Sequence, residues 1–368
     1  MELDTGILKR EEQVVFALRS LYHRYGYGQY KMSKFEEYDL YGKNKDFLIS
    51  GGVITFTDTN GRLMALKPDV TLSIVKSSRP APGQVQKVYY NENVYRISKS
   101  SGSFKEIMQA GLECIGDVDD YCLAEVLVLA GESLRLISDE FRLSLSHAGI
   151  VENMLDALAL DGEARRQALR CLGEKNLHEL EAVCAAAGCE EAAVARLKAL
   201  SQLSGSADEV LPRLTALGCD PTAVNQLRQL SAVLAESGLA HQLCIDFSVL
   251  GDMRYYNGIT FKGYVRGVPE SVISGGQYDK LLRRMGKPGR AVGFAVYLDL
   301  LERLDEAQRG YDADTVLLYE TGADPAVLSA AVRSLQKDGS VLAVKAVPED
   351  LRYRRLMKLT ESGVAEDA

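Results

Sequence analysis

The chain has 368 residues, of which 46% are hydrophobic, enough for two or three domains with sizeable cores. It carries 43 lysines and arginines against 51 aspartates and glutamates, and the formal net charge of −8 argues against a protein that holds nucleic acid on a broad basic surface. The N-terminus is charged rather than apolar, and no run of about 18 apolar residues occurs, so we expect a cytoplasmic protein without a membrane-spanning segment.

The cysteines are odd in number and show no CxxC spacing, while the four histidines are scattered along the chain. We therefore expect reduced, mostly buried thiols of the kind found in cytosolic proteins, rather than disulfides or a metal site. Neither a metal nor a cofactor is expected. The seven cysteines are Cys114, Cys122, Cys171, Cys184, Cys189, Cys219 and Cys244.

Helix and hairpin patterns open the chain. Apolar residues recur at helical spacing over residues 11–25, which predicts an amphipathic helix. The Asn60-Gly61 pair between residues 53–57 and 63–66 is a strong turn signal and predicts a β-hairpin. The aromatic and acidic segment 35–41 is expected to run beside the sheet.

The residues after this hairpin favour a helix start. Pro68 restricts Lys67 to an extended backbone and is itself compatible with the first turn of a helix, which we expect over residues 71–77. Asp69 and Thr71 then lie at the N-terminus of this helix. Helix capping and ligand binding both account for these two side chains, and the pattern alone does not decide between them.

Two strands, residues 84–95 and 108–116, are expected on either side of a polar loop at residues 98–103. Gln109 and Glu113 are separated by an even number of positions, so both side chains lie on one face of the second strand. This face is either the solvated side of the sheet or part of a binding site.

Helices are expected over residues 122–136 and through 151–239, where alanine, leucine, glutamate and arginine recur at helical spacing. The longer stretch shows no basic face of the kind that an RNA clamp needs, so a helical subdomain or a protein-binding surface is favoured. From residue 315 the pattern predicts a strand, a helix, a strand and a second helix, the last over residues 350–360.

Residues 244–304 have the pattern of a chain that lines a pocket. Glycines let the backbone approach a ligand closely, and Tyr255 and Tyr256 offer rigid faces with polar tips. A small polar molecule is the expected ligand. The expected elements are a strand over residues 259–264, a glycine turn over 275–279, a strand over 293–295 and an amphipathic helix over 298–304.

Several motifs, taken in order, resemble the catalytic domain of histidyl-tRNA synthetases. Its first half is similar to KPDVT, NVYR and MQAGLE in this chain, and its closing third to YYNGITF, SGGQYD and GFAVYLDLLERL. The resemblance covers residues 10–305 and implies an α+β fold of the class II aminoacyl-tRNA synthetase type, with an antiparallel sheet flanked by helices, in a homodimer. It also implies synthetase-like halves over residues 1–145 and 243–310, a helical insertion over 146–242 and a small α/β C-terminal tail over 311–368.

The same resemblance implies a pocket for L-histidine. In the synthetases the residue that matches Arg96 meets the amino-acid carboxylate, and those that match Gln109 and Glu113 reach the amino and imidazole groups. Asp69 stands where the synthetases have glutamate. The residues carried over as histidine-binding are Asp69, Thr71, Arg96, Gln109, Glu113, Tyr255, Tyr256 and Tyr278.

Two cations of the synthetase site are missing. The family's catalytic arginine is replaced by Gly251, and the position of its nucleotide-holding arginine is Leu300. Arg254 and Arg290 lie close enough in sequence to be candidate replacements, and the loop after Arg96 is altered. Because such cations stabilise the phosphoryl transition state, their loss implies negligible adenylation and no catalytic residues.

A synthetase-like chain with a histidine pocket and without those arginines resembles the regulatory subunits of ATP phosphoribosyltransferase. This resemblance implies a non-catalytic subunit that binds histidine, activates a short-form catalytic partner and confers feedback inhibition by histidine. The alternatives are a divergent histidyl-tRNA synthetase and an amino-acid-activating enzyme that acts on a protein or small molecule. The C-terminal tail is short for an anticodon-binding domain, so tRNA is not the expected partner.

Overall fold

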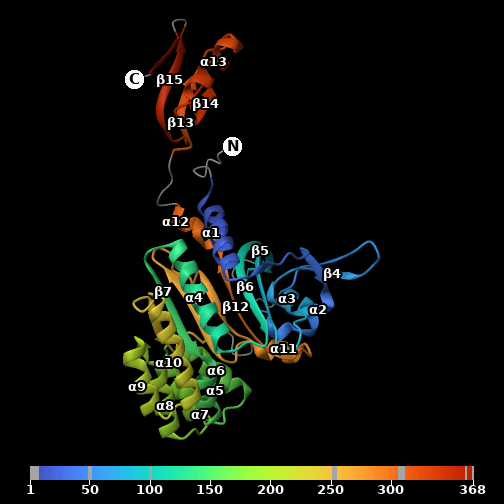
Figure 1. Cartoon of the computed structure of the whole chain (residues 1–368), viewed down its shortest axis with the longest axis vertical. Helices are drawn as coiled ribbons and strands as arrows, with labels where there is room; N and C mark the ends of the chain where they lie inside the picture. The colour runs from blue at the N-terminus through green and yellow to red at the C-terminus, as the bar shows by residue number, and fades with distance from the viewer. Residues whose placement is uncertain are drawn as a thin grey trace. The chain divides into compact units, whose positions relative to one another are not determined.

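The longest ladder in the protein joins two strands of 13 residues, β5 (Val85–Ile97) and β6 (Phe104–Gly116), which pair antiparallel. The computed structural model in Figure 1 describes residues 8–48, 52–98, 102–250, 255–305, 311–360 and 363–366. The chain divides into two units, Met1–Leu304 and Asp305–Ala368, and each has a sheet of its own.

The larger unit is built on a sheet of nine strands in the order β1-β5-β6-β12-β11-β10-β7-β9-β8. Pairing is antiparallel from β5 to β7, whereas β1 runs parallel to β5 and β9 runs parallel to β7. A mainly antiparallel sheet of this size confirms the predicted class of fold. The remaining strands are β1 (Gly28–Gln29), β12 (Arg290–Tyr297), β11 (Ile273–Gln277), β10 (Ile259–Val265), β7 (Phe141–His147), β9 (Leu243–Asp246) and β8 (Ser204–Gly205).

Side-chain alternation along the strands separates two hydrophobic cores, one on each face of the sheet. Leu112 and Cys114 of β6 belong to the core beneath α1 (Arg10–Arg24) and α4 (Asp120–Ile137). Ile115, on the alternate face of β6, belongs to the other core. That second core is covered by α3 (Thr71–Ser77), α11 (Asp279–Arg284) and a small sheet of β2 (Phe35–Glu37), β4 (Leu63–Leu66) and β3 (Thr55–Thr57).

The local predictions for the first half of the chain are confirmed, with one change. Helix α1 matches the amphipathic pattern, β3 and β4 form the hairpin around Asn60-Gly61, and α3 covers the expected residues. Segment 35–41 is not hydrogen-bonded into the main sheet, and its Tyr41 packs in the core on one face of that sheet. The segment forms β2 and the start of α2 (Tyr38–Lys43). Strand β2 pairs with β4, as in the pair Glu36 and Ala65, and so belongs to the three-stranded sheet.

Six helices follow β7, interrupted only by the short strand β8 within the part of this stretch that is described. Four of them begin at Asp161, Asn176, Ser206 and Asp220, whose side chains accept backbone N–H groups of the first turn. The helices are α5 (Ala148–Asp156), α6 (Gly162–Gly173), α7 (Leu177–Ala186), α8 (Glu191–Ser201), α9 (Ala207–Ala216) and α10 (Pro221–Glu236). None of the described helices is long and apolar enough to cross a membrane.

The expected glycine turn over residues 275–279 is wrong. Gly275 and Gly276 lie in β11, which is hydrogen-bonded to β10 on one side and β12 on the other. A Cβ atom on Gly275 would meet the carbonyl oxygen of Gly293 at 2.5 Å, so glycine serves close strand packing here rather than a turn. Residues 298–304 form a 3-10 turn, Leu298–Leu301, followed by α12 (Glu302–Asp305) rather than one continuous helix.

The smaller unit has the strand order β14-β13-β15-β16, and α13 (Pro325–Leu335) lies between β13 and β14 in sequence. The helix expected over residues 350–360 is wrong, because β15 (Tyr353–Thr360) forms instead. Its arginine, leucine, methionine and lysine residues favour a helix, but hydrogen bonding to strands on both sides overrides that preference. The other strands are β13 (Ala313–Leu318), β14 (Val341–Val344) and β16 (Gly363–Glu366).

All seven cysteines are free thiols, and six of them are buried. Burial raises the pKa of Cys184 to about 11, which keeps this thiol protonated and unreactive near neutral pH. The cysteines of the helical stretch therefore act as small apolar side chains that fill its core.

Candidate functional site

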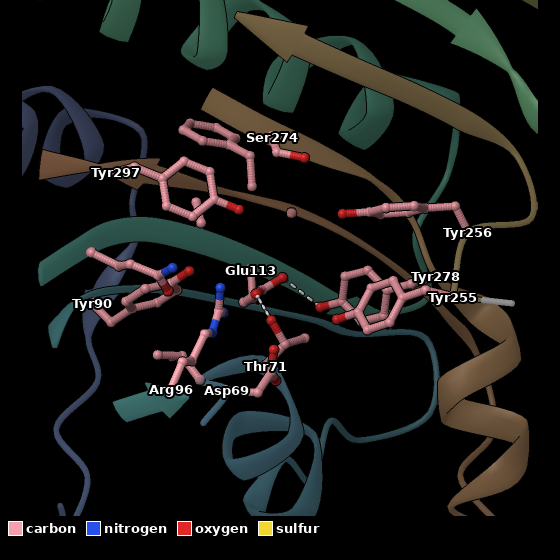
Figure 2. A pocket seen from close by; sticks show the side chains of 15 residues that line it. Asp69, Thr71, Tyr90, Arg96, Glu113, Tyr255, Tyr256, Ser274, Tyr278 and Tyr297 are labelled. Carbon is pink, nitrogen blue, oxygen red and sulfur yellow. Dashed lines mark hydrogen bonds between the residues drawn. The ribbon is translucent and has the colours of Figure 1, made fainter. Parts of the chain in front are cut away.

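The eight residues singled out from the sequence line one pocket on the α3 side of the main sheet (Figure 2). They come from the start of α3, from β5 and β6, and from the segments that precede β10 and follow β11. Long-range strand pairing therefore assembles a site whose residues are up to 209 positions apart, from Asp69 to Tyr278. They are Asp69, Thr71, Arg96, Gln109, Glu113, Tyr255, Tyr256 and Tyr278.

The strand register explains why the side chains converge. Gln109 of β6 pairs with Tyr297 of β12, and Glu113 pairs with Gly293, so alternate residues of both strands face the same space. Gly293 is required there, because a Cβ atom on it would overlap the carboxyl group of Glu113. Gln109 and Glu113 are only 3% and 2% exposed, so the interpretation of this face as the solvated side of the sheet is wrong.

The Glu113 carboxyl group lies at the centre of the pocket. Thr71 Oγ1 donates to its Oε1 at 2.7 Å, and the Tyr278 hydroxyl donates to its Oε2 at 2.5 Å. Burial raises the pKa of Glu113 to about 8, and the nearby Asp69 adds to the rise, although the two hydroxyl donors oppose it. Glu113 is therefore mostly uncharged at neutral pH, and a cationic group of a ligand would favour its ionisation.

Asp69 has two functions at the start of α3. One carboxylate oxygen accepts the Leu72 backbone N–H at 2.8 Å, as in helix capping, and the same buried side chain lines the pocket. Burial raises the pKa of Asp69, opposed by the Leu72 N–H and by Arg96. Asp69 therefore bonds the first turn of α3 and also lines the pocket. Thr71 is different, since its hydroxyl is directed to Glu113.

Arg96 is the only cation among the described residues that line the pocket, and it faces two carboxyl groups. Its Nε donates to the carbonyl oxygen of Pro68 at 3.0 Å, which fixes the stem of the side chain. Figure 2 shows its guanidinium group between Tyr90 and Glu113, directed into the pocket. A guanidinium group held in this way suits a carboxylate ligand, which it can bind through two parallel hydrogen bonds.

Gln109 carries a buried polar group that is directed to the pocket without a described partner. Its side-chain nitrogen is buried and has no hydrogen-bond partner within the described part of the chain. A buried donor without a partner costs about 1–3 kcal/mol, so an acceptor supplied by a ligand would be stabilised there.

Tyrosines form the apolar wall. The rings of Tyr255 and Tyr256 meet edge to face with centroids 4.9 Å apart, and Tyr278 lies 5.5 Å from Tyr255. Burial raises the pKa of all three hydroxyls, so they stay neutral and serve as hydrogen-bond donors and acceptors.

The sequence analysis missed three polar residues of the lining, namely Tyr90, Ser274 and Tyr297. Tyr90 precedes Arg96 by six positions on β5 and so shares its face, a signal that was present in the sequence. Tyr297 depends on the pairing of β12 with β6, which local patterns do not reveal. Its hydroxyl interacts with Arg96 and adds a polar contact beside that cation.

The size of the pocket limits its ligand. About 420 Å³ is free of protein atoms, including space open to solvent. With one cation, two carboxyl groups, an unpaired amide and several tyrosine hydroxyls, the pocket has the chemistry to hold a free amino acid with a second polar group.

The structure describes one of the two positions at which a synthetase arginine is replaced, Leu300, and one of the two candidate replacements, Arg290. Leu300 packs against the core beneath α1 and α4. Arg290 donates to the carbonyl oxygen of Val118 at 3.0 Å and is not among the described residues that line the pocket, so it does not replace a missing arginine there. Gly251, Arg254 and residues 99–101 of the altered loop lie outside the described residues.

Comparisons with known proteins point to one family. A family model described as histidyl-tRNA synthetase matches residues 2–301. The chain is 30% identical to the ATP phosphoribosyltransferase regulatory subunit of Moorella thermoacetica, over 94% of this chain and 92% of that protein. It is 27% identical to the regulatory subunit of Clostridium kluyveri, again over 94% and 92% of the two chains.

Solved structures share the fold. A structure described as an ATP phosphoribosyltransferase regulatory subunit/histidyl-tRNA synthetase from Bacillus halodurans superposes with a TM-score of 0.73 at 22% identity, covering 97% of this chain and 99% of that one. A chain of the ATP phosphoribosyltransferase (HisG:HisZ) complex from Thermotoga maritima gives a TM-score of 0.62 at 20% identity, covering 78% and 97%.

The raised pKa of Glu113 predicts how stability depends on pH. The carboxyl group ionises near its ordinary pKa of 4.5 in the unfolded chain and near 8 in the folded one, so the folded state loses stability as the pH rises between these values. Glu113→Gln removes this titration and keeps groups that can bond Thr71 and Tyr278. Across that window we expect the free energy of unfolding of the unaltered protein to fall by up to about 1.4 kcal/mol more per pH unit than that of the variant.

Urea denaturation of both proteins at several pH values measures this difference. Glu236→Gln is the matched control, because Glu236 is an exposed carboxylate on α10, and it should keep the pH dependence of the unaltered protein. If Glu113→Gln keeps it as well, the buried carboxyl group does not titrate as described.

Proposed function

Because this chain belongs to the histidyl-tRNA synthetase-like family of ATP phosphoribosyltransferase regulatory subunits, we propose that it binds L-histidine and controls a short-form ATP phosphoribosyltransferase in histidine biosynthesis. The observation that carries the histidine assignment is the pocket itself. One arginine, two carboxyl groups and an unpaired amide converge beside a wall of tyrosines.

Each group of histidine has a partner of suitable chemistry. Arg96 pairs with the α-carboxylate through its guanidinium group. Glu113 and Gln109 bond the imidazole and the ammonium group, and Asp69 adds a second carboxylate near them. The ring lies against the tyrosine wall. A ligand with one anionic and one cationic group, plus a further polar ring, uses more of these contacts than a simple apolar amino acid does.

The subunit is proposed to lack adenylation activity. Leu300 is packed in an apolar core, and Arg290 is engaged by Val118 outside the pocket, so neither described position supplies a cation to a phosphate. Loss of one group that stabilises a developing anion costs about 3 kcal/mol of transition-state stabilisation. With glycine at position 251 as well, the amino-acid contacts persist without the phosphate contacts.

The proposed partner follows from the family. The Thermotoga maritima structure is described as a complex of two kinds of chain, and by analogy this chain assembles with a short ATP phosphoribosyltransferase. A homodimer of this chain within that assembly, located in the cytoplasm, is part of the proposal. Binding of histidine to this chain then changes the activity of the partner.

A divergent histidyl-tRNA synthetase is the second candidate, because the matching family model carries that description and the residues carried over from the synthetases line one pocket. The two functions differ in chemistry. A synthetase activates histidine with ATP and transfers it to tRNA, whereas a regulatory subunit only binds it.

Calorimetry tests the ligand. L-histidine should bind with measurable heat, and Glu113→Ala should weaken binding by about 1–3 kcal/mol because a polar contact of the ligand is left unpaired. Glu236→Ala, on the exposed face of α10, should leave the affinity unchanged. Absence of heat with histidine, or equal heat with other amino acids, would contradict the assignment.

ATP–pyrophosphate exchange tests the absence of catalysis. The purified chain should show no histidine-dependent exchange. Restoring Gly251→Arg alone should not produce exchange, since groups that bind a transferring phosphoryl act as a unit. Exchange in the unaltered protein at a rate usual for synthetases would make the second candidate the better one.

Assembly with the cognate short phosphoribosyltransferase tests the regulatory role. The two chains should co-elute in size-exclusion chromatography, and the catalytic chain should become faster and sensitive to histidine in an assay of phosphoribosyl-ATP formation. Glu113→Ala should reduce the sensitivity to histidine and leave assembly intact. No co-elution together with no change in rate would refute the regulatory proposal.

A further inference from the structure

A second large concavity lies on the other face of the main sheet from the histidine pocket. It is a groove lined by residues of α4, α10 and the end of α1, with about 1300 Å³ free of protein atoms, including space open to solvent. Figure 1 shows where α1, α4 and α10 lie in the fold. Tyr25 and Tyr121 stand at its edge, and Val128, Leu230 and Val233 are among the apolar residues of its lining. This groove is not explained by the proposed binding of histidine.

The groove leaves apolar surface uncovered. Tyr121 is 66% exposed, and Tyr25 and Val233 are each 37% exposed. Isolated exposed apolar residues are common, but two tyrosines and a valine beside one apolar groove are characteristic of a protein contact, where tyrosine is enriched at the residues that dominate binding.

The charge at the groove has one sign. Asp120 and Glu125 are the only charged residues in its lining as described, and both are acidic. Lys87 donates to Glu125 at 2.7 Å and compensates its charge. Asp120 therefore contributes most of the negative charge at the groove. A partner segment with an apolar face and flanking lysine or arginine complements such a surface.

The walls of the groove are held together by polar contacts between elements. Gln226 of α10 donates to Asp120 of α4 at 2.9 Å and lies 3.2 Å from Nε2 of His147. Tyr27 also donates to Glu125 at 3.1 Å. The groove is therefore formed before any partner binds, which reduces the ordering cost of binding.

Strand β6 and helix α4 lie between the histidine pocket and the groove. Glu113 of β6 faces the pocket, while the next residue, Cys114, faces α4 and contacts Cys122 of that helix. Cys114 also pairs in register with Lys87, the residue that holds Glu125 at the groove. A shift of β6 on ligand binding would reach the groove through these packed side chains.

We propose that this groove is the docking surface for a basic-flanked amphipathic helix of the phosphoribosyltransferase partner, an inference that rests on the proposed function. An apolar trough between two helices is the usual receptor for such a segment. The exposed Asp120 at the groove complements the basic flanks of such a segment, and the labelling experiment below distinguishes this partner from a second copy of this chain.

Paired arginine substitutions test the proposal in the full-length chain with its cognate partner. Val233→Arg puts a cation into the groove and should weaken assembly at least tenfold, measured by sedimentation or surface binding. Leu136→Arg is the matched control, since Leu136 is 44% exposed on α4 and lies outside the groove lining, and it should stay within about twofold of the unaltered affinity. Tyr121→Ala should weaken assembly without the added charge.

The outcomes separate this inference from the proposed function. If the unaltered chains assemble and Val233→Arg assembles equally well with normal histidine calorimetry, the groove is not the docking surface although the regulatory function stands. If the unaltered chains do not assemble, the docking proposal and the regulatory function are both contradicted. A photo-crosslinking amino acid at position 121 should label a helix of the phosphoribosyltransferase, whereas labelling of a second copy of this chain would overturn the proposal.

Discussion

A carboxyl group removed from water is the constraint on which the pocket depends. Glu113 is 2% exposed on the central strand of the site and is kept there by two hydroxyl donors, one from α3 and one from the segment after β11. Those bonds link three parts of the chain that are far apart in sequence. The same carboxyl group requires a glycine opposite it on β12, so the composition of a neighbouring strand follows from it.

The main sheet separates an apolar core on one face from the polar pocket on the other. Ala110, Leu112 and Cys114 of β6 lie in an apolar core beneath α1 and α4, while Gln109 and Glu113 on the opposite face carry polar groups into the pocket. A strand with this arrangement cannot slip by one residue without moving Glu113 into the core and Leu112 into the pocket. The site and the core therefore fix each other's register.

The residues of the pocket were predictable from sequence where local chemistry and motif order agreed. Asp69 and Thr71 follow from the helix start after Pro68, and the shared face of Gln109 and Glu113 follows from strand alternation. Tyr297 required knowledge of which strands pair. The segment 353–360 and Gly275 were misassigned for the same reason, because tertiary pairing decided against local preference for a helix and a turn.

The unpaired amide of Gln109 and the buried carboxyl of Glu113 also have an evolutionary consequence. Both lower the stability of the empty protein, so apolar replacements that pack well would be favoured wherever selection for the ligand is relaxed. Under relaxed selection, Gln109 and Glu113 should be replaced before the apolar residues of the surrounding core are. A relative that keeps the fold but carries leucine or methionine at both positions would lack the polar contacts that the proposed ligand needs.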